Sequence, residues 1–242
     1  MIKFFRKIRQ QLLTENKFSK YLLYAIGEIV LVVIGILIAL SINNWNEEKQ
    51  RVNEEKSLLT KLVYSVQSNM EYLERSRDTD REVIKSINKL IYTLENDLPY
   101  NDSIGFHFHN SINGNAATFS TSALETIRSR GIDIIKSDSI RDMVLNLFDM
   151  TYTNIEDMYQ ADQSSFFNNE VSIYMKNFRM KDGIAIPKDY ELLLNNFEIL
   201  SLLEWRLEIR HFSLAGKEEG IEKSKGLIKR INEYLNLADK QK

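Results

Sequence analysis

The longest apolar stretch of the chain covers residues 21–42 and contains a single charged residue, Glu28. As an α-helix this stretch rises about 33 Å, at ~1.5 Å per residue, which matches the roughly 30 Å hydrocarbon core of a bilayer. Tyr21 and Tyr24 at one end and Trp45 at the other are aromatic residues of the kind that favour the membrane interface. The pattern therefore predicts a transmembrane helix.

The charges on either side of this stretch predict its orientation. Residues 1–20 carry six lysines and arginines, whereas residues 47–56 carry three together with four glutamates. Because basic flanks stay in the cytoplasm, we expect a cytoplasmic leader over residues 1–20 and an inner-membrane protein whose residues 43–242 lie in the periplasm. A cleaved signal peptide is the alternative, since Ala39 and Ser41 form a small-x-small site, but the apolar run is longer than a signal sequence needs.

Apolar residues continue beyond the predicted span at seven-residue intervals, which indicates a helical stalk. Glu48 and Glu55 hold positions that a coiled coil would fill with apolar residues, so the first part of such a seam is weak. From Leu58 onward the apolar stripe widens, as packing into a bundle requires. The seven-residue series is Trp45, Val52, Leu59, Val66 and Leu73.

Helix start and stop signals divide the rest of the chain. Thr79 and Ser122 are each followed three residues later by glutamate, the capping-box pattern, and predict two helix starts. A long helix is expected from about Asp138 to Met180, and a last one from about Asn195, although three glycines interrupt it. We therefore predict an all-α fold in which a transmembrane helix continues into a stalk and an antiparallel extracytoplasmic helical bundle.

The remaining segments carry turn signals. Residues 99–120 are rich in Asn, Ser and Gly and contain the Asn113-Gly114 pair, so they are interpreted as a long loop. Residues 132–135 form either a turn or a very short strand. Asp182-Gly183 is expected to break the preceding helix, and Pro187 to begin a short helical turn.

Glu28 is costly inside a membrane and needs a partner. Gly35 and Ala39 follow it by seven and eleven residues, close to the same helical face, with the small-xxx-small spacing that lets helix backbones approach. We hypothesise that Glu28, Gly35 and Ala39 form a packing face for another membrane helix. A protonated Glu28, a hydrogen bond to Tyr24, or attraction toward Lys20 are the alternatives.

The opening MIKFFRKIRQ, followed by NKFSKYLLYAIGEIVLVVIGILIALSINNWNEE, closely resembles the N-terminus of a family of uncharacterised single-pass membrane proteins common in Bacteroidota. The resemblance covers residues 1–48, and TSALETIRSRGIDII at residues 121–135 is similar to a more weakly shared segment. It implies an anchored, mostly helical extracytoplasmic domain of unknown function. It implies no catalytic residues.

The chain carries no recognisable catalytic motif. It lacks a Gly-rich phosphate loop, a zinc-protease helix and a nucleophile elbow, and without cysteine it has no thiol chemistry, disulfides or lipid-modified cysteine. His107 and His109 form a possible metal pair, but no third ligand is indicated, so loop histidines are the simpler interpretation. We expect no enzyme and no cofactor. Residues 43–242 carry a net charge of about −6, which disfavours nucleic acid as a partner.

Two functions are consistent with these features. The first is an envelope interaction or scaffold module, whose partners are the lipid bilayer and another membrane or envelope protein, or a second copy. The alternative is a periplasmic bundle that senses a small ligand and acts through a partner protein. A pocket with converging polar groups would favour the sensor, whereas a flat apolar patch would favour the scaffold.

Overall fold

The computed structural model describes residues 18–114 and 118–240. It divides into two compact units, residues 1–55 and 56–242, and the boundary falls inside the long helix α2 (Phe18–Glu95).

The first unit contains the apolar segment of α2, and most of the described side chains of this segment are exposed. Among the described residues, α2 is the one helix long and apolar enough to cross a membrane, although a signal sequence near an N-terminus has the same properties. Trp45 is exposed. The leader up to residue 17, and the side chains of Tyr21 and Tyr24, lie outside the part of the chain that the structure describes.

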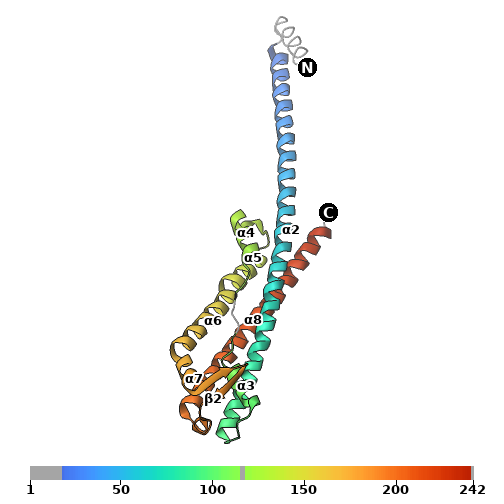
Figure 1. Cartoon of the computed structure of the whole chain (residues 1–242). Coiled ribbons are helices and arrows are strands. Elements are labelled where there is room, and N and C mark those ends of the chain that lie inside the picture. Colours follow the sequence, from blue (N-terminus) through green and yellow to red (C-terminus); the bar gives the residue numbers. More distant parts are fainter. Residues whose placement is uncertain (1–17, 115–117, 241–242) are drawn as a thin grey trace. The chain divides into compact units, whose positions relative to one another are not determined.

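The second unit is built almost entirely from helices (Figure 1). The predicted all-α class is confirmed in this broad sense. After α2 the chain forms α3 (Asp102–Ser111), α4 (Ser122–Arg130), the 3₁₀ turn η1 (Ile132–Ile134), α5 (Asp138–Leu145), the π-helical η2 (Asn146–Tyr152), α6 (Thr153–Ser165), the π-helical η3 (Phe166–Glu170), α7 (Val171–Asn177), β1 (Phe178–Lys181), β2 (Ile184–Pro187), the 3₁₀ turn η4 (Glu191–Leu193) and α8 (Phe197–Lys240).

Helices α2 and α8 pack antiparallel along a buried seam. On both helices the buried positions recur at intervals of four and three residues, the period that keeps one face of a helix against its neighbour. The buried positions of α2 in this unit include Leu59, Leu62, Val66, Asn69, Leu73, Ser76, Asp80, Val83, Ile87, Leu90 and Leu94. Those of α8 include Ile199, Leu203, Arg206, Arg210, Lys217, Gly220, Ser224, Leu227 and Ile231.

The apolar part of this seam belongs to two separate hydrophobic clusters. One cluster joins α2 around Val66 to η2 and the second half of α8. The other joins α2 around Ile87 to α3, α7, the hairpin and the start of α8. Between them, both helices place polar residues on the seam.

The predicted helix start at Thr79 is wrong, because α2 continues through it without a break. The Thr79 hydroxyl donates to the carbonyl oxygen of Arg75, one turn earlier, at 3.3 Å and so does not cap a new helix. The buried positions Ser76, Asp80 and Val83 keep the same helical face turned inward on both sides of this point. Continuous packing against α8 therefore outweighs the local capping signal.

The interpretation of residues 99–120 as a long loop is wrong for α3. The side chain of Asn101 accepts a hydrogen bond from the backbone N–H of Ile104 at 3.1 Å, which caps the helix, and Ile104 and Phe108 are buried one turn apart. Gly105 lets α3 lie close to β2, because a Cβ there would stand 2.5 Å from Ile184 Cγ2. Tertiary burial of this short apolar face stabilises a helix that its Asn and Ser content disfavours.

Residues 178–187 form a hairpin that the all-α prediction missed. The preceding helix ends at Asn177, before the expected Met180, and Pro187 closes β2 where a helical turn was expected. Asp182 and Gly183 both have positive φ, 51° and 76°, the backbone of a two-residue hairpin turn. Asp182-Gly183 is thus a turn signal that joins two strands. Residues 132–134 adopt the turn of the two alternatives considered for them.

The last helix, α8, is continuous through Gly216, Gly220 and Gly226. Gly220 lies where helices come close together, since a Cβ there would stand 3.0 Å from Leu73 Cδ1 and 3.1 Å from Ile155 Cδ1. The low helix propensity of this glycine is therefore offset by the close packing that it permits.

Candidate functional site

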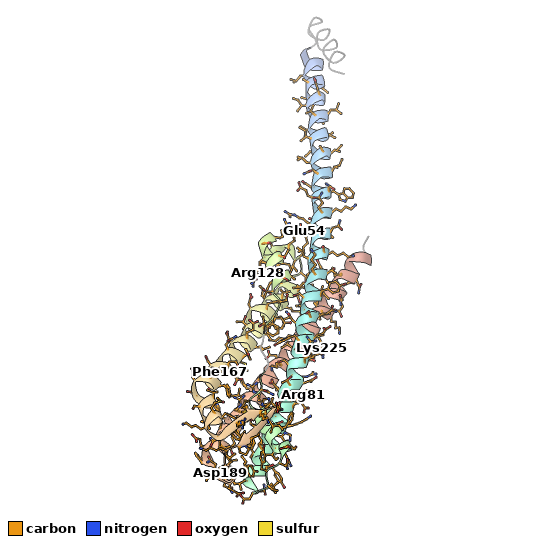
Figure 2. The ribbon with its side chains drawn as sticks, viewed as in Figure 1. Glu54, Arg81, Arg128, Phe167, Asp189 and Lys225 are labelled. Carbon is orange, nitrogen blue, oxygen red and sulfur yellow. The ribbon has the colours of Figure 1, made fainter. Side chains whose placement is uncertain are left out.

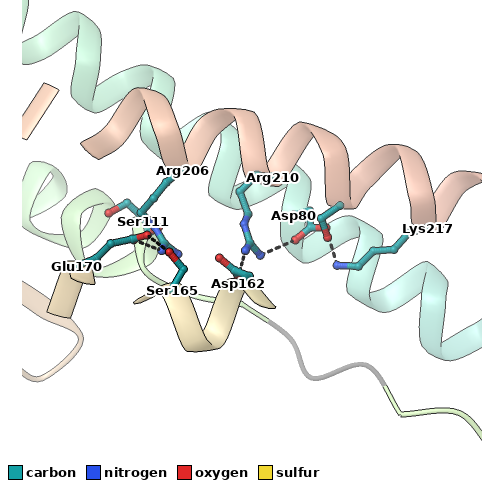
Figure 3. Close-up of polar contacts among 9 residues, drawn as sticks. Asp80, Ser111, Asp162, Ser165, Glu170, Arg206, Arg210 and Lys217 are labelled. Carbon is teal, nitrogen blue, oxygen red and sulfur yellow. Dashed lines mark hydrogen bonds and ion pairs between the residues drawn. The ribbon is translucent and has the colours of Figure 1, made fainter. Parts of the chain in front are cut away.

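Six buried charged side chains lie together between the two hydrophobic clusters (Figure 3). Three are acidic and three are basic, so their formal charges cancel. They come from three parts of the chain that are far apart in the sequence: α2, the adjacent elements α6 and η3, and α8. The residues are Asp80 on α2, Asp162 on α6, Glu170 on η3, and Arg206, Arg210 and Lys217 on α8.

Asp80 is the acceptor at one end of this charged layer. It has no exposed surface and accepts hydrogen bonds from Lys217 Nζ at 2.5 Å and from the Ser213 hydroxyl at 2.8 Å. Arg210 lies between Asp80 and Asp162 and forms an ion pair with each (Figure 3). A single arginine therefore connects α2 and α6 through α8.

Arg206 and Glu170 form the other end of the layer. Arg206 Nη1 donates to Glu170 Oε2 at 2.8 Å, and Arg206 Nε donates to the carbonyl oxygen of Ser111 at 2.8 Å. The guanidinium also lies over the ring of Phe166, with Cζ 5.1 Å from the ring centroid. Arg206 thus closes the C-terminus of α3 and holds η3 against α8.

Burial of these charges costs hydration free energy, and the pKa of Lys217 reflects this cost. Burial lowers the pKa of Lys217 from its ordinary value, although the charge of Asp80 and its hydrogen bond act in the opposite direction. A buried ion pair seldom gains more from attraction than its ions lose in hydration, so replacing it with apolar side chains is often neutral or stabilising. An apolar seam would be the simpler way to hold α2 and α8 together. The layer therefore calls for an explanation other than stability.

A cleft of about 540 Å³ opens between α6 and α8 over this layer. Its walls are mainly apolar and aromatic, and include Met158, Tyr159, Trp205 and Phe212. Trp205 and Phe212 lie seven residues apart on α8 and are 57% and 69% exposed. The polar part of the lining consists of Asp162, Ser165, Glu208, Arg210, Ser213 and Lys217.

Two residues that line the cleft each have one enclosed polar atom without a hydrogen-bond partner in the described structure. The atoms are Arg210 Nε, a donor, and Asp162 Oδ1, an acceptor, and both are buried. Buried polar atoms are paired in the great majority of cases, so such exceptions point to a bound molecule, a water or a functional role. Gly114 lies beside the same two residues, because a Cβ there would stand 3.3 Å from Arg210 Nη1. The turn predicted at Asn113-Gly114 thus ends next to the charged layer.

Helix α6 lies between two π-helical segments, η2 and η3. Single π-helical turns are rare and occur frequently at functional sites, because the extra residue redirects side chains on one face. The segment η3 places Glu170 and Phe166 against Arg206. The local distortion therefore brings one acid of the layer into position.

The residues singled out in the sequence do not contribute to this site. Glu28, Gly35 and Ala39 lie in the first unit, where a Cβ on Gly35 would meet no atom within 4 Å. Their predicted role in helix packing stays a prediction, as does that of Tyr21, Tyr24 and Trp45 at the membrane interface.

His107 and His109 lie on the helix α3 and not in a loop. The ring of His107 shares a hydrogen bond with the Ser86 hydroxyl, Nδ1 to Oγ 3.0 Å, and burial lowers its pKa. Among the described residues no group of three or more His, Cys, Asp or Glu could hold a metal ion.

The sequence carried a signal for the charged layer that the prediction did not use. Asp80 continues the seven-residue apolar series after Leu73, so an acid stands where a buried residue is due. Arg206, Arg210 and Lys217 lie four and seven residues apart, on one face of α8. Charged residues at positions of an otherwise apolar stripe indicate buried charge, but which acid meets which base depends on the fold.

A family model with the description "Family of unknown function (DUF6090)" matches residues 28–185, about two thirds of the chain. The match includes α6, with one wall of the cleft, and ends before α8, which supplies the other. The chain matches no curated protein and no solved structure.

Proposed function

We propose a function from the structure of this chain, which belongs to the Family of unknown function (DUF6090): a single membrane span anchors a helical domain that binds a small ligand between α6 and α8. In this proposal, ligand binding changes how the domain interacts with another membrane or envelope protein. We therefore prefer the function of a small-ligand sensor to that of a scaffold.

The observation that carries the proposal is the cleft itself. Ligand sites are concave, have volumes of roughly 300–1,000 Å³, and combine apolar walls with a few fixed polar groups. The cleft has a volume of about 540 Å³, aromatic walls at Trp205 and Phe212, and buried polar groups at Arg210 and Asp162. A flat apolar patch would have supported the scaffold instead.

The proposal places residues 21–42 in the inner membrane and the domain in the periplasm. The length and apolarity of the segment, the basic leader, and the resemblance to single-pass membrane proteins of Bacteroidota support this placement. A phosphatase fused after Lys242 should be active and a cytoplasmic fluorophore fused before Met1 should be bright. The reverse pattern would contradict the orientation.

The ligand site is tested by filling the cleft. Ala161 is an exposed residue of α6 that lines the cleft, whereas its neighbour Gln160 is exposed and does not line it. Full-length wild type, Ala161→Phe and the control Gln160→Phe are screened in detergent against a library of small polar and apolar metabolites by thermal shift. We expect stabilising compounds that act on wild type and on the control but not on Ala161→Phe. A library without any compound of this behaviour would contradict the proposal.

The scaffold remains a second candidate because large apolar side chains are exposed elsewhere. Phe167 on η3 (Figure 2) and Phe197 at the start of α8 are 64% and 85% exposed. Exposed apolar side chains of this size are common at protein interfaces. Crosslinking of the full-length protein in membranes, wild type against Phe197→Glu, tests this candidate. A crosslinked product that the substitution abolishes would support it.

A further inference from the structure

We infer, on the basis of the ligand-binding function proposed above, that the ligand of the α6–α8 cleft is an organic cation, with an ammonium or quaternary ammonium group attached to an apolar body. Three features of the cleft indicate this class. They are an acid in the lining that the charged layer does not neutralise, the sign of the exposed charges on both wall helices, and the aromatic side chains beside that acid.

Glu208 is the charge in the cleft lining that the charged layer leaves unbalanced. Two bases also line the cleft, Arg210 and Lys217, but their side chains are only 3% and 4% exposed. Arg210 forms an ion pair with Asp162, and Lys217 forms one with Asp80. Glu208 is exposed, and its carboxylate forms no ion pair or hydrogen bond with the described residues. The bases are therefore neutralised by buried partners, and the charge that a ligand meets in the cleft is negative.

The exposed charges of the two wall helices are all acidic. Helix α6 carries three acids and no lysine or arginine. Residues 197–217 of α8 carry three lysine or arginine residues, and all three are buried in the charged layer. His211 is exposed as well and is neutral in the formal charge at pH 7. The exposed charged residues of these two segments are Asp157, Glu198, Glu204 and Glu208. A cleft whose walls carry charge of one sign attracts ligands of the opposite sign, so this cleft favours a cation over an anion.

Aromatic side chains flank Glu208 in the lining. Trp205 precedes Glu208 by three residues and Phe212 follows it by four, and residues at these spacings are neighbours on one face of a helix. All three line the cleft, and Tyr159 lines it from α6. The faces of aromatic rings attract cations, and quaternary ammonium groups are recognised by aromatic side chains in this way. A carboxylate between two aromatic side chains therefore suits an ammonium group, and the apolar walls suit the body attached to it.

Three probes of similar shape and different charge test the inference. Benzyltrimethylammonium is the cation, neopentylbenzene is its neutral isostere with carbon in place of nitrogen, and benzylphosphonate carries a tetrahedral anionic group on the same benzyl body. Trp205 lines the cleft and Trp45 is the second of the two tryptophans, so Trp45→Phe leaves Trp205 as the sole tryptophan reporter. The full-length Trp45→Phe protein, reconstituted in nanodiscs of zwitterionic lipid, is titrated at pH 7 with each probe while the Trp205 fluorescence is followed. Empty nanodiscs with free tryptophan correct for partitioning and quenching.

We expect the cation to bind at least about fivefold more tightly than the neutral isostere and the anion. Equal or tighter binding of the neutral isostere or the anion would overturn the inference and leave the proposed ligand site standing. Absence of a Trp205 response to all three probes would also overturn the inference. The metabolite screen with Ala161→Phe then decides separately whether the cleft is a ligand site.

Two variants show which groups set the preference for a cation. Glu208→Gln removes a charge but keeps the shape of an exposed side chain, so it should weaken binding of the cation at least about threefold and leave that of neopentylbenzene unchanged. Glu204→Gln is the matched control, because Glu204 is exposed on the same helix and does not line the cleft. Phe212→Leu keeps an apolar side chain without the aromatic ring and should weaken binding of the cation more than that of neopentylbenzene.

Equal effects of Glu208→Gln and Glu204→Gln on binding of the cation would contradict the role of Glu208. An equal loss of affinity for the cation and for neopentylbenzene in Phe212→Leu would contradict the role of the aromatic ring.

Discussion

Asp80 on α2 accepts a hydrogen bond at 2.5 Å from Lys217 on α8, 137 residues later, and neither side chain has more than 4% of its surface exposed. The pair lies on the seam between the two long helices, between the two hydrophobic clusters that they share. Substitutions in this buried pair should therefore change the free energy of unfolding more than substitutions in exposed ion pairs do.

Removing one member of this pair should destabilise the domain strongly. Asp80→Leu leaves Lys217 and Arg210 with excess positive charge in a buried site, and breaking a buried pair costs about 3–5 kcal/mol. Glu82→Ala, which removes an exposed ion pair with Lys85, should cost at most about 1 kcal/mol and serves as control. Urea unfolding of the full-length protein in detergent, followed by circular dichroism, measures both. Equal effects of the two substitutions would contradict the burial argument.

The double variant Asp80→Leu with Lys217→Leu should be more stable than the sum of the single changes predicts. The remaining pairs, Arg210 with Asp162 and Arg206 with Glu170, are balanced, so no buried charge is left alone. Coupled residues of this kind show interaction free energies of about 0.5–3 kcal/mol in double-mutant cycles. Strict additivity of the two changes would show that the residues do not interact.

Tyr152 should make stability depend on pH in the alkaline range. Burial raises its pKa to about 12, although hydrogen bonds to Ser224 and Asn69 lower it. Because the folded-state pKa lies above the ordinary value of 10, the stabilisation is complete below pH 10 and is lost as the pH rises toward 12. A shift of this size corresponds to about 2–3 kcal/mol.

The difference in unfolding free energy between wild type and Tyr152→Phe should therefore shrink as the pH rises from 10 to 12. Urea unfolding at several pH values across this range provides the measurement. Tyr64→Phe, at an exposed tyrosine, corrects for the general loss of stability at high pH. A difference that stays constant with pH would show that Tyr152 does not titrate as expected.

Two glycines of α8 should respond in opposite directions to a larger side chain. Gly220→Val places new atoms against Leu73 and Ile155, which are already 3.0 and 3.1 Å from a Cβ at this position, and should destabilise by about 1–3 kcal/mol. Gly226→Ala is exposed and meets Met143 at 3.7 Å, an ordinary contact, so it should stabilise by about 0.5–1 kcal/mol through helix propensity. Thermal unfolding distinguishes the two outcomes. Equal stability changes at both sites would contradict the close approach at Gly220.

The predicted membrane face should affect association but not the stability of the helical domain. In the described part of the chain a Cβ at Gly35 would meet no atom of another segment within 4 Å, so the unfolding transition of Gly35→Ile should match wild type, whereas bulk at this position should weaken contact with another membrane helix. Glu28→Leu should weaken the same contact by about 0.6–2 kcal/mol, and Glu28→Gln by less, because an amide still forms hydrogen bonds. A two-hybrid or crosslinking signal from the isolated span compares the variants. Identical signals from all of them would exclude Glu28, Gly35 and Ala39 as a packing face.

Much of the architecture was predictable because it depends on local pattern. The seven-residue series on α2 and the apolar stripe of α8 are each encoded within a few turns of the chain. The three errors have one origin. At Thr79, in α3 and at the Asp182-Gly183 turn, a local signal was ambiguous and contacts with distant residues chose between its meanings.

The sequence by itself determined which faces of the helices are buried, since the apolar period requires a partner for each stripe. It also marked Asp80, Arg206, Arg210 and Lys217 as charged residues on those faces. Only the tertiary structure decided that they meet, because their acidic partners Asp162, on α6, and Glu170, on η3, come from another part of the chain. The cleft also depends on the tertiary structure. Trp205 and Met158 line a common cleft only because α6 and α8 lie side by side. Pairing energies of buried charges depend on distances between elements, and local sequence pattern does not contain those distances.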